Sequence, residues 1–300
     1  MKQIVSISLG SSTRDKSVDV ELLGESLRIQ RIGTNGSMDR FAELMEEWDG
    51  HADCLCLGGL DLYLVCGGRQ YTFRQARALA KHATHTPVVD GSGLKNTLER
   101  ETIHRLHKDR TVKLVDQHIL LVSGIDRFGM AEALHEMDCE LAFGDLAFSL
   151  GVGVAIKSWL MLNIVGFLLL PIVTRLPIQW LYPTGKAQEE ISPKFFNLYD
   201  WADIIAGDFH FIRRHLPDNL SNKGIITNTT TADDLELLRS RNLDWLVTTT
   251  PEFEGRSFGT NVMEGVCVAL LDKSTAEVTT DDYLNILQQL KWTPRFVTLT

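Results

Sequence analysis

The segment 117–145, QHILLVSGIDRFGMAEALHEMDCELAFGD, constrains the fold more than any other part of the sequence. A short apolar run at 118–122 predicts a buried strand, glycines follow it, and apolar residues three and four apart at 130–137 predict a helix. A second apolar run, 139–143, ends at Gly144-Asp145. A strand, a glycine turn, a helix and a second strand within about 30 residues form a βαβ unit, as in a dinucleotide-binding half-domain.

The glycine loop of this unit departs from the dinucleotide fingerprint G-x-G-x-x-G at its middle position. Gly124 and Gly129 match the outer glycines, but Asp126 stands where a glycine lets the backbone approach the pyrophosphate. Arg127 could compensate for this carboxylate, or Asp126 could turn outward and cap the helix. Asp145, about 20 positions past the first glycine, suits a ribose hydroxyl. These residues predict NAD as cofactor, and an α/β unit packed without nucleotide is the alternative.

Composition and charge are those of a globular protein with an acidic balance. The 300 residues are 44% hydrophobic and 23% charged, and this length can bury the cores of two domains. A net charge of −9 argues against nucleic acid or an anionic membrane as a general partner. Five cysteines without framework spacing, and a first strand that begins directly after Met1-Lys2, predict a cytoplasmic protein.

The order of predicted elements gives an α/β fold with two domains. A smaller mixed α/β domain, residues 1–108, precedes a Rossmann-like parallel-sheet domain, residues 109–300. Ligands of open parallel sheets bind outside the carboxyl ends of the strands, so we expect these ends to line one crevice. In the second domain the predicted strand ends are Gly124, Asp145, Asp208, Asn228 and Thr249.

The most apolar segment is 159–181, WLMLNIVGFLLLPIVTRLPIQWL. A membrane-spanning helix needs about 20 uninterrupted apolar residues. Asn163, Pro171, Arg175 and Pro177 interrupt this segment, so we expect no stable membrane insertion. A buried helix, a homodimer interface and one wall of an apolar pocket all remain open.

Two short segments resemble the shikimate/quinate dehydrogenase family. Residues 90–94, DGSGL, resemble the family's N-T-D-G-x-G stretch, whose aspartate belongs to the catalytic pair. Residues 244–251, DWLVTTTP, resemble its D-L-V-I-N-T-T-P strand, which flanks the nicotinamide. A helix expected at 260–271 stands where the family places a helix over that ring. The resemblance implies dehydrogenase activity, with Thr249 and Thr250 beside the cofactor.

The sequence also departs from this family. Residues 1–85 lack its N-V-T-x-P-x-K stretch with the catalytic lysine, and segment 159–181 has no counterpart there. The cofactor strand ends in Gly144-Asp145 rather than in the Asn-Arg pair that accompanies NADP, and a carboxylate repels a 2′-phosphate, so NAD is favoured. A more distant likeness, in domain order and final helix, is to the cyanobacterial acyl-carrier-protein reductases, whose nucleophilic cysteine would fall near Thr260.

Oxidising an alcohol with NAD needs a group that takes the hydroxyl proton and donors that hold the substrate. Asp90 and Lys95, five positions apart across a predicted turn and helix start, are the first candidates for the catalytic pair. Their plainer interpretations are a helix-capping carboxylate and a solvated lysine. His210, at a predicted strand end, is an independent candidate base, or else an ordinary loop histidine.

The candidate substrate ligands are Tyr182 and Lys186 in a polar turn, and Arg256 and Asn261 beside a helix start, which favours negative groups. The spacing of histidines and cysteines does not match a metal site. The sequence therefore predicts an NAD-dependent oxidoreductase that acts on a hydroxylated, anionic small molecule. A reductase for a bulkier apolar substrate and a non-redox small-molecule-binding protein are the alternatives.

Overall fold

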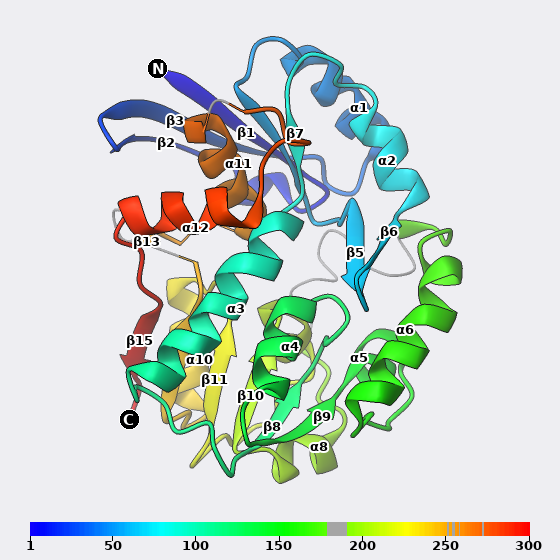
Figure 1. Cartoon of the computed structure of the whole chain (residues 1–300), viewed down its shortest axis with the longest axis vertical. Coiled ribbons are helices and arrows are strands. Elements are labelled where there is room, and N and C mark those ends of the chain that lie inside the picture. Colours follow the sequence, from blue (N-terminus) through cyan, green and yellow to red (C-terminus); the bar gives the residue numbers. More distant parts are fainter. Residues whose placement is uncertain (179–190, 251, 254–255, 258, 272) are drawn as a thin grey trace.

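The computed structural model describes residues 1–300 except 179–190, 251, 254–255, 258 and 272, and describes no side chains between 251 and 258. Two sheets lie one above the other in Figure 1, and each is flanked by helices. The N-terminal strands belong to the upper sheet, and the C-terminus lies beside the lower one. This arrangement confirms the predicted α/β class, with a Rossmann-like parallel sheet preceded by a smaller mixed sheet.

The first sheet has the strand order β2-β3-β1-β4-β7 and is parallel except for β2. Its inner strand β4, CLCLG, is apolar and wholly buried, as expected for a strand covered on both faces. The edge strand β2 alternates between exposed and half-buried residues. The elements are β1 (Lys2–Ser8), β2 (Lys16–Leu22), β3 (Glu25–Gly33), α1 (Met38–Trp48), β4 (Cys54–Gly58) and β7 (Val88–Val89), with a 3-10 turn at Ser12–Arg14.

The second sheet has the order β15-β12-β11-β10-β8-β9 and is parallel except for β15. The predicted βαβ unit forms β8, α4 and β9, and a capping box of Thr231 and Asp234 begins α10. The elements are β8 (His118–Leu121), α4 (Phe128–His135), β9 (Glu140–Phe143), α5 (Asp145–Leu150), α8 (Phe196–Trp201), β10 (Ile204–Gly207), α9 (Phe209–Arg214), β11 (Gly224–Thr227), α10 (Ala232–Ser240), β12 (Trp245–Thr248) and β15 (Arg295–Thr298).

Both sheets share one topological feature that positions the site. The first strand of each sheet has later strands on both sides: β1 lies between β3 and β4, and β8 lies between β9 and β10. The chain therefore leaves the first strand in one direction and later returns on its other side. At such a switch point the connections diverge and leave a crevice at the carboxyl ends of the strands.

Helices connect the two halves in both directions. Helix α3 (Ser92–Lys108) runs from the first sheet towards the second and packs against α4 (Figure 1). Helix α11 (Thr260–Leu271) returns to the first sheet and packs on β4 and β1, where Lys2 Nζ donates to the Ala269 carbonyl at 2.5 Å. Helix α12 (Thr280–Gln289) packs against α3 and α11.

The remaining elements lie beside these layers. A hairpin of β5 (Tyr63–Cys66) and β6 (Arg69–Thr72) leads into α2 (Arg74–Ala80). A short pair, β13 (Glu252–Phe253) and β14 (Arg256–Ser257), precedes α11.

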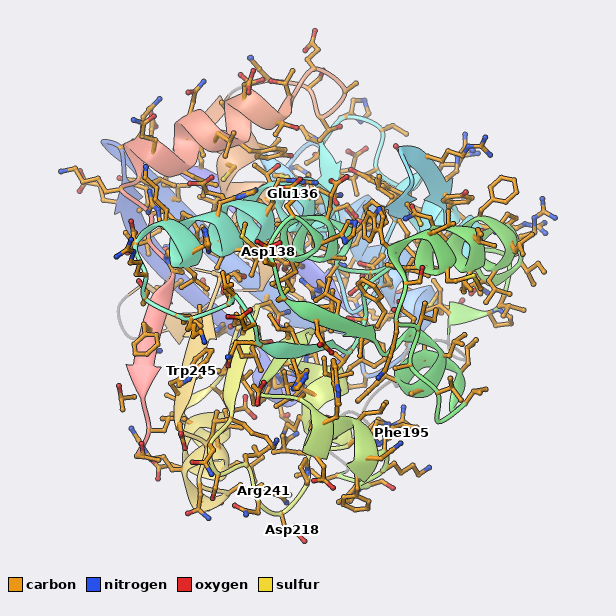
Figure 2. All side chains as sticks on the ribbon, turned by 60° about the horizontal axis from the view of Figure 1, so that its bottom comes forward. Glu136, Asp138, Phe195, Asp218, Arg241 and Trp245 are labelled. Carbon is orange, nitrogen blue, oxygen red and sulfur yellow. The ribbon has the colours of Figure 1, made fainter. Side chains whose placement is uncertain are left out.

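On the amino-terminal side of the second sheet, Arg241 connects the end of α10 to the loop before β11. It pairs with Asp218 at 3.1 Å and donates to the carbonyls of Leu216 and Pro217 (Figure 2). A cavity of about 230 Å³ also lies on this side, lined by residues that include Asp203, Asn222 and Trp245.

The apolar segment 159–181 forms helix α6 (Trp159–Val173), and residues 179–181 lie outside the described part of the chain. Only one side of α6 is buried, through Leu162, Gly166 and Leu170. Among the described residues, none of the helices combines the length and apolarity needed to cross a membrane.

Candidate functional site

A cleft of about 460 Å³ lies where the carboxyl ends of the two sheets face each other. Ser8 and Gly58 line it from β1 and β4 of the first sheet, and Asp126 and Asp208 line it from the loops after β8 and β10. Both switch points thus open onto the same space. Its volume lies in the range of small-molecule sites, about 300–1,000 Å³.

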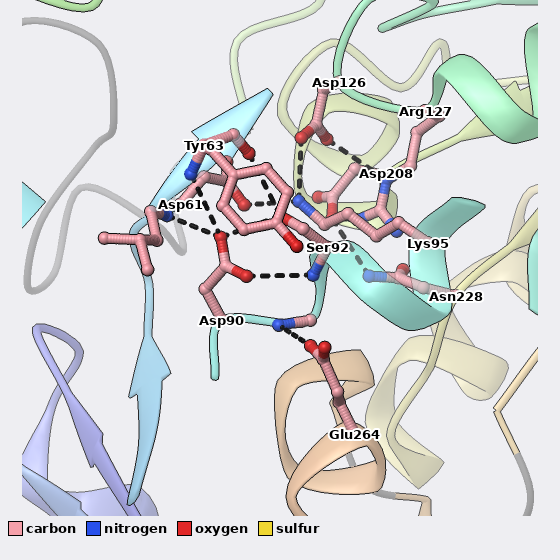
Figure 3. A network of polar contacts seen from close by, with 12 residues as sticks. Asp61, Tyr63, Asp90, Ser92, Lys95, Asp126, Arg127, Asp208, Asn228 and Glu264 are labelled. Atoms are coloured by element: carbon pink, nitrogen blue, oxygen red, sulfur yellow. Dashed lines mark hydrogen bonds and ion pairs between the residues drawn. The ribbon is translucent and has the colours of Figure 1, made fainter. Parts of the chain in front are cut away.

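The floor of the cleft holds a buried lysine between two carboxylates (Figure 3). Lys95, in the first turns of α3, donates from Nζ to Asp126 Oδ1 at 2.8 Å and to Asp61 Oδ1. The Lys95 and Asp61 side chains are only 9% and 8% exposed. Asp61 stands three residues past the end of β4, so the ion pair joins the first sheet to α3.

The pair is electrostatically asymmetric. Burial raises the pKa of Asp61 to about 6, although Lys95 opposes this. Burial would lower the pKa of Lys95, but Asp126 and then Asp61 outweigh it and raise that pKa well above its usual value. For Asp126, burial is outweighed by Lys95 and Arg127, so its pKa is lowered. Lys95 therefore stays an ammonium, and Asp61 changes its protonation near neutral pH.

A buried arginine joins the two loops at the second switch point. Arg127, 3% exposed, pairs with Glu99 of α3, with Asp208 after β10, and through Nε with Asp126 at 3.1 Å. Burial raises the pKa of Glu99 to about 7 against the effect of Arg127. In Asp208 the burial effect is outweighed by Arg127, and its pKa falls to about 2. Asn228 Nδ2 also donates to Asp208, at 3.0 Å.

The start of α11 forms the opposite wall of the cleft. Thr260 is 5% exposed, and its Oγ1 has no hydrogen-bond partner among the described residues. Asn261 Nδ2 donates to Ser6 Oγ at 3.1 Å, and Arg31 donates to Ser8 Oγ at 3.0 Å. A helix N-terminus with free donors favours an anion. The cationic side chains of Arg14, Lys16 and Arg214 and the imidazole of His210 also line the cleft.

Asp90 has a structural environment that explains its position at the end of β7. Its carboxylate accepts from the Ser92 amide at 3.0 Å, from Ser92 Oγ at 2.7 Å and from the amides of Leu62 and Tyr63 (Figure 3). It thus binds the first residue of α3, whose N-cap is Gly91, and anchors the loop before β5. Asp90 lines the cleft, but the carboxylates that pair with Lys95 are those of Asp61 and Asp126.

Residues 93–299 match the family model described as Domain of unknown function (DUF8754). The chain belongs to the DUF8754 family. Residues 3–90 match a second model, Domain of unknown function (DUF8753), and the two regions meet at the turn between Asp90 and α3. No curated protein matches the chain. Asp61 therefore comes from the DUF8753 region, and Lys95 comes from the DUF8754 region.

Solved structures with similar arrangements belong to different functional classes. A sugar ABC transport substrate-binding protein from Bordetella parapertussis 12822 is 10% identical, with a TM-score of 0.36 over 90% of this chain and 80% of that one. A galactofuranose-binding protein is 10% identical, with a TM-score of 0.37 over 97% and 99%. A mutant of glutamate dehydrogenase is 12% identical, with a TM-score of 0.41 over 88% and 63%. Likeness at this level does not distinguish an enzyme from a binding protein.

The residues expected to bind NAD in the DUF8754 region are divided between the cleft and the core. Asp145 accepts from the amides of Gly124 and Ile125 at 3.0 and 2.8 Å, and burial raises its pKa to about 6. A Cβ at Gly124 would lie 2.8 Å from the ring of Phe143. Neither Gly124 nor Asp145 lines the cleft, although both were expected to line the crevice. The reason is that the Asp145 carboxylate accepts hydrogen bonds from the loop amides that were expected to bind the cofactor.

Three further predicted cofactor residues are engaged elsewhere. Gly129 allows α4 to approach the Asn96 backbone, where a Cβ would lie 2.7 Å away. The Thr249 carbonyl accepts from Trp292 Nε1 at 3.0 Å, and Thr250 Oγ1 donates to the Asn228 carbonyl at 2.8 Å. Of the predicted cofactor set, the structure therefore places two residues at the cleft: Asp126 and Arg127.

The other predicted residues are placed as follows. His210 is exposed at the cleft, and its amide donates to Asp208 at 2.8 Å. Asn261 also lines the cleft. Tyr182 and Lys186, and the side chain of Arg256, lie outside the described residues. Within the described part of the chain, no cluster of three or more histidine, cysteine or acidic residues could hold a metal.

Sequence reasoning missed several residues that build the site. Asp61 lies in the loop after β4, before the hairpin strand that begins at Tyr63. The available signal was its position just past Gly58-Gly59 at the carboxyl end of a buried strand. Glu99 and Arg31 carried no such signal, since their partners are distant in sequence.

Proposed function

We propose that this protein is an enzyme that acts on a hydroxylated, anionic small molecule bound in the cleft between the two sheets. The observation that carries this proposal is the buried Asp61–Lys95 pair at the cleft floor. Buried titratable groups with perturbed pKa values that open onto a cavity are typical of catalytic sites. The position at two facing switch points supports it independently.

In this proposal Lys95 and Asp61 share acid–base chemistry. The Lys95 ammonium donates a hydrogen bond to the substrate oxygen, since its raised pKa keeps it protonated. Asp61, with a pKa of about 6, is mostly ionised at pH 7 and accepts the hydroxyl proton, which its acid form can return. Asp126 holds Lys95 in its charged form when Asp61 is protonated.

The anionic part of the substrate is proposed to bind at the start of α11. The Thr260 hydroxyl, which has no partner among the described residues, is a donor there, at the positive end of a 12-residue helix. The side-chain amide of Asn261, which donates one hydrogen bond to Ser6, is a second donor. Arg14 and Arg31 line the same cleft, and Arg31 is paired with Asp15 at 2.9 Å. Together with the helix start, the Arg14 guanidinium favours a ligand that carries negative charge.

Oxidation or reduction of the hydroxyl carbon is the finer part of the proposal, and it comes from the resemblance to shikimate dehydrogenases. NAD would supply the hydride acceptor for that reaction. The glycine loop does not fit a dinucleotide in the expected pose, because Asp145 already accepts from the amides of Gly124 and Ile125. No step assigned to Asp61 or Lys95 therefore depends on NAD.

A binding screen followed by a turnover assay tests the proposal. Quinate, shikimate, gluconate and glucose 6-phosphate are compared with the uncharged polyols glucose and inositol by scanning fluorimetry and calorimetry. Each is measured alone and with NAD(H) or NADP(H), and products are followed by NMR. We expect at least one hydroxylated anion to raise Tm and to bind with a Kd below about 1 mM, and no uncharged polyol to match it.

Variants then separate binding from catalysis. Thr260→Val and Asn261→Leu should weaken binding of that anion at least about tenfold, because each removes a donor from a desolvated site. Asp61→Asn should retain binding and lose turnover. Binding without turnover under every cofactor condition would make the protein a binding protein. If none of the four anions binds, the proposal that the cleft binds a hydroxylated anion is wrong.

A further inference from the structure

Helix α6 exposes a continuous apolar face on the outside of the molecule, along the right-hand edge of Figure 1. Its 15 residues are apolar on all sides except at Asn163, whereas a helix of this kind is normally buried all round. Leu160, Leu168 and Ile172 lie eight and four residues apart, about two turns and one turn of the helix, and each is at least 60% exposed. Met161, Ile164 and Phe167 widen the same face. A patch of this kind marks an interaction surface.

The two stretches of the chain that form α6 and the β5–β6 hairpin with α2 carry charge of one sign only. Residues 62–81 and 146–178 contain no aspartate or glutamate, although the whole chain has 39 in 300 residues. The two stretches are neighbours: the Arg74 amide donates to the Thr174 carbonyl at 3.0 Å, and the Arg69 guanidinium lies 4.9 Å from the Phe167 ring centroid. Their arginines and lysines are Arg69, Arg74, Arg77, Lys81, Lys157 and Arg175.

These cations are available to a partner. Arg69, Arg74 and Arg175 are exposed, and within the described part of the chain none of the three forms an ion pair. The face therefore combines exposed Leu, Ile, Met and Phe side chains with unneutralised cations, in a protein whose overall net charge is −9. The helix itself has no charged face, so the cations come from the neighbouring hairpin, α2 and Arg175. Exposed apolar side chains bordered by cations favour the surface of an anionic bilayer.

We propose that α6, together with the β5–β6 hairpin and α2, is a docking surface for an anionic phospholipid bilayer. The α6 helix would lie in the plane of the membrane, with Leu160, Phe167 and Leu168 among the headgroups. Arg69 and Arg175 would contact lipid phosphates. Docking of this kind is shallow and does not require a helix that spans the membrane.

A second copy of the chain fits this face less well. A two-fold dimer brings the same patch of each subunit together, so both sides of the interface would carry the cations around α6. Like charges placed opposite each other disfavour association. Nucleic acid is also a poor match, since it is recognised by cations and stacking aromatics rather than by exposed leucine and isoleucine.

Vesicle flotation of the full chain tests the proposal. Phosphatidylcholine vesicles are compared with vesicles that contain about one third phosphatidylglycerol, each at about 0.05 M and about 0.5 M NaCl. We expect binding to the anionic vesicles at low salt, and binding at least about fivefold weaker on neutral vesicles or at high salt. Leu168→Glu and Arg175→Glu should each reduce binding to anionic vesicles roughly tenfold.

Matched controls carry the same substitutions on other surfaces. Leu23→Glu, at an exposed leucine between β2 and β3, and Arg40→Glu, on α1, should bind as wild type does. Equal binding to neutral and anionic vesicles, no binding to either, or equal losses in the control variants would overturn the proposal. So would light scattering that shows a wild-type dimer and a monomeric Leu168→Glu variant, because the face would then be a subunit interface.

Discussion

The ammonium of Lys95 is paired with the carboxylate of Asp61, which lies 34 positions earlier in the chain, at the floor of the cleft. The loop after β4 and the first turns of α3 meet through this pair. Asp126 approaches the same ammonium from the loop after β8, at 2.8 Å. Three segments that are far apart in sequence therefore converge on one nitrogen atom, and the protonation of Asp61 determines whether this cluster carries excess negative charge.

Asp61→Asn should lower kcat by roughly 10²–10⁴-fold on the substrate found in the binding screen, because it removes the proton acceptor. KM should change little. In the wild type, activity should fall below about pH 6, where Asp61 becomes protonated, and this limb should be absent from residual activity of the variant. The pH–rate profile is the measurement, and Asp19→Asn, at an exposed carboxylate, is the control. If the Asp61→Asn variant keeps the acidic limb of the pH–rate profile, a group other than Asp61 causes that limb.

Arg127→Met should destabilise the fold by about 3–5 kcal/mol, because it leaves the buried Glu99 and Asp208 carboxylates without their cation. Urea denaturation measures the free energy of unfolding. Arg28→Met, which breaks the exposed pair with Asp19, is the matched control and should have little effect. Equal effects of the two variants would show that the Arg127 cluster does not hold the second switch point together.

The raised pKa of the buried Glu264 carboxyl should make the folded protein less stable as pH rises. Burial, and then Asp90, raise its pKa from 4.5 to about 8 in the folded state, while Tyr283 and the Gly91 amide donate to it. The folded state therefore binds a proton more tightly than the unfolded state does. This contribution is complete below about pH 4.5 and is lost as pH rises through about 8.

The test for Glu264 is the slope of Tm between pH 5 and about pH 8.5. Glu264→Gln should make this slope shallower, because its side chain does not titrate. Asp61, Glu99 and Asp145, whose pKa values are also raised, keep part of the slope in the variant. Glu236→Gln, on the exposed side of α10, should retain the wild-type slope. Identical slopes in all three proteins would contradict a protonated Glu264.

Local patterns predicted much of the fold because they reflect local physics. The βαβ unit expected at 117–145 forms β8, α4 and β9, and the helix expected at 260–271 has those bounds. Apolar runs bounded by glycines predicted the parallel strands, and their order predicted two α/β halves. None of these signals depends on contacts between distant residues.

The candidate site was less predictable, because its contacts join segments distant in sequence. The spacing from Gly124 to Asp145 fits a nucleotide fingerprint, but it also lets α5 begin at Asp145 and direct that carboxylate at the loop amides. Lys95 was found from its position at a helix start. Asp61 was not, because no sequence rule links a loop after β4 to a lysine on α3.

The return of α11 to the first sheet can be tested at Gly265, which faces β4 and β1. A Cβ there would press on Cys56 Sγ and lie 3.1 Å from Ile4 Cγ2. Gly265→Ala should therefore destabilise the fold by about 1–3 kcal/mol, despite the roughly 1 kcal/mol by which alanine favours a helix over glycine.

A second substitution distinguishes overpacking at Gly265 from a general effect on the helix. Cys56→Ala removes the sulfur atom that the new methyl group meets, so Gly265→Ala should cost less in this background than in the wild type. The coupling energy from this double-mutant cycle, measured by urea denaturation, should be about 0.5–3 kcal/mol. If Gly265→Ala stabilises the protein, or if the two substitutions are additive, α11 does not pack its glycine face against β4. The cleft wall formed by Thr260 and Asn261 would then lose its support, since both residues begin the same helix.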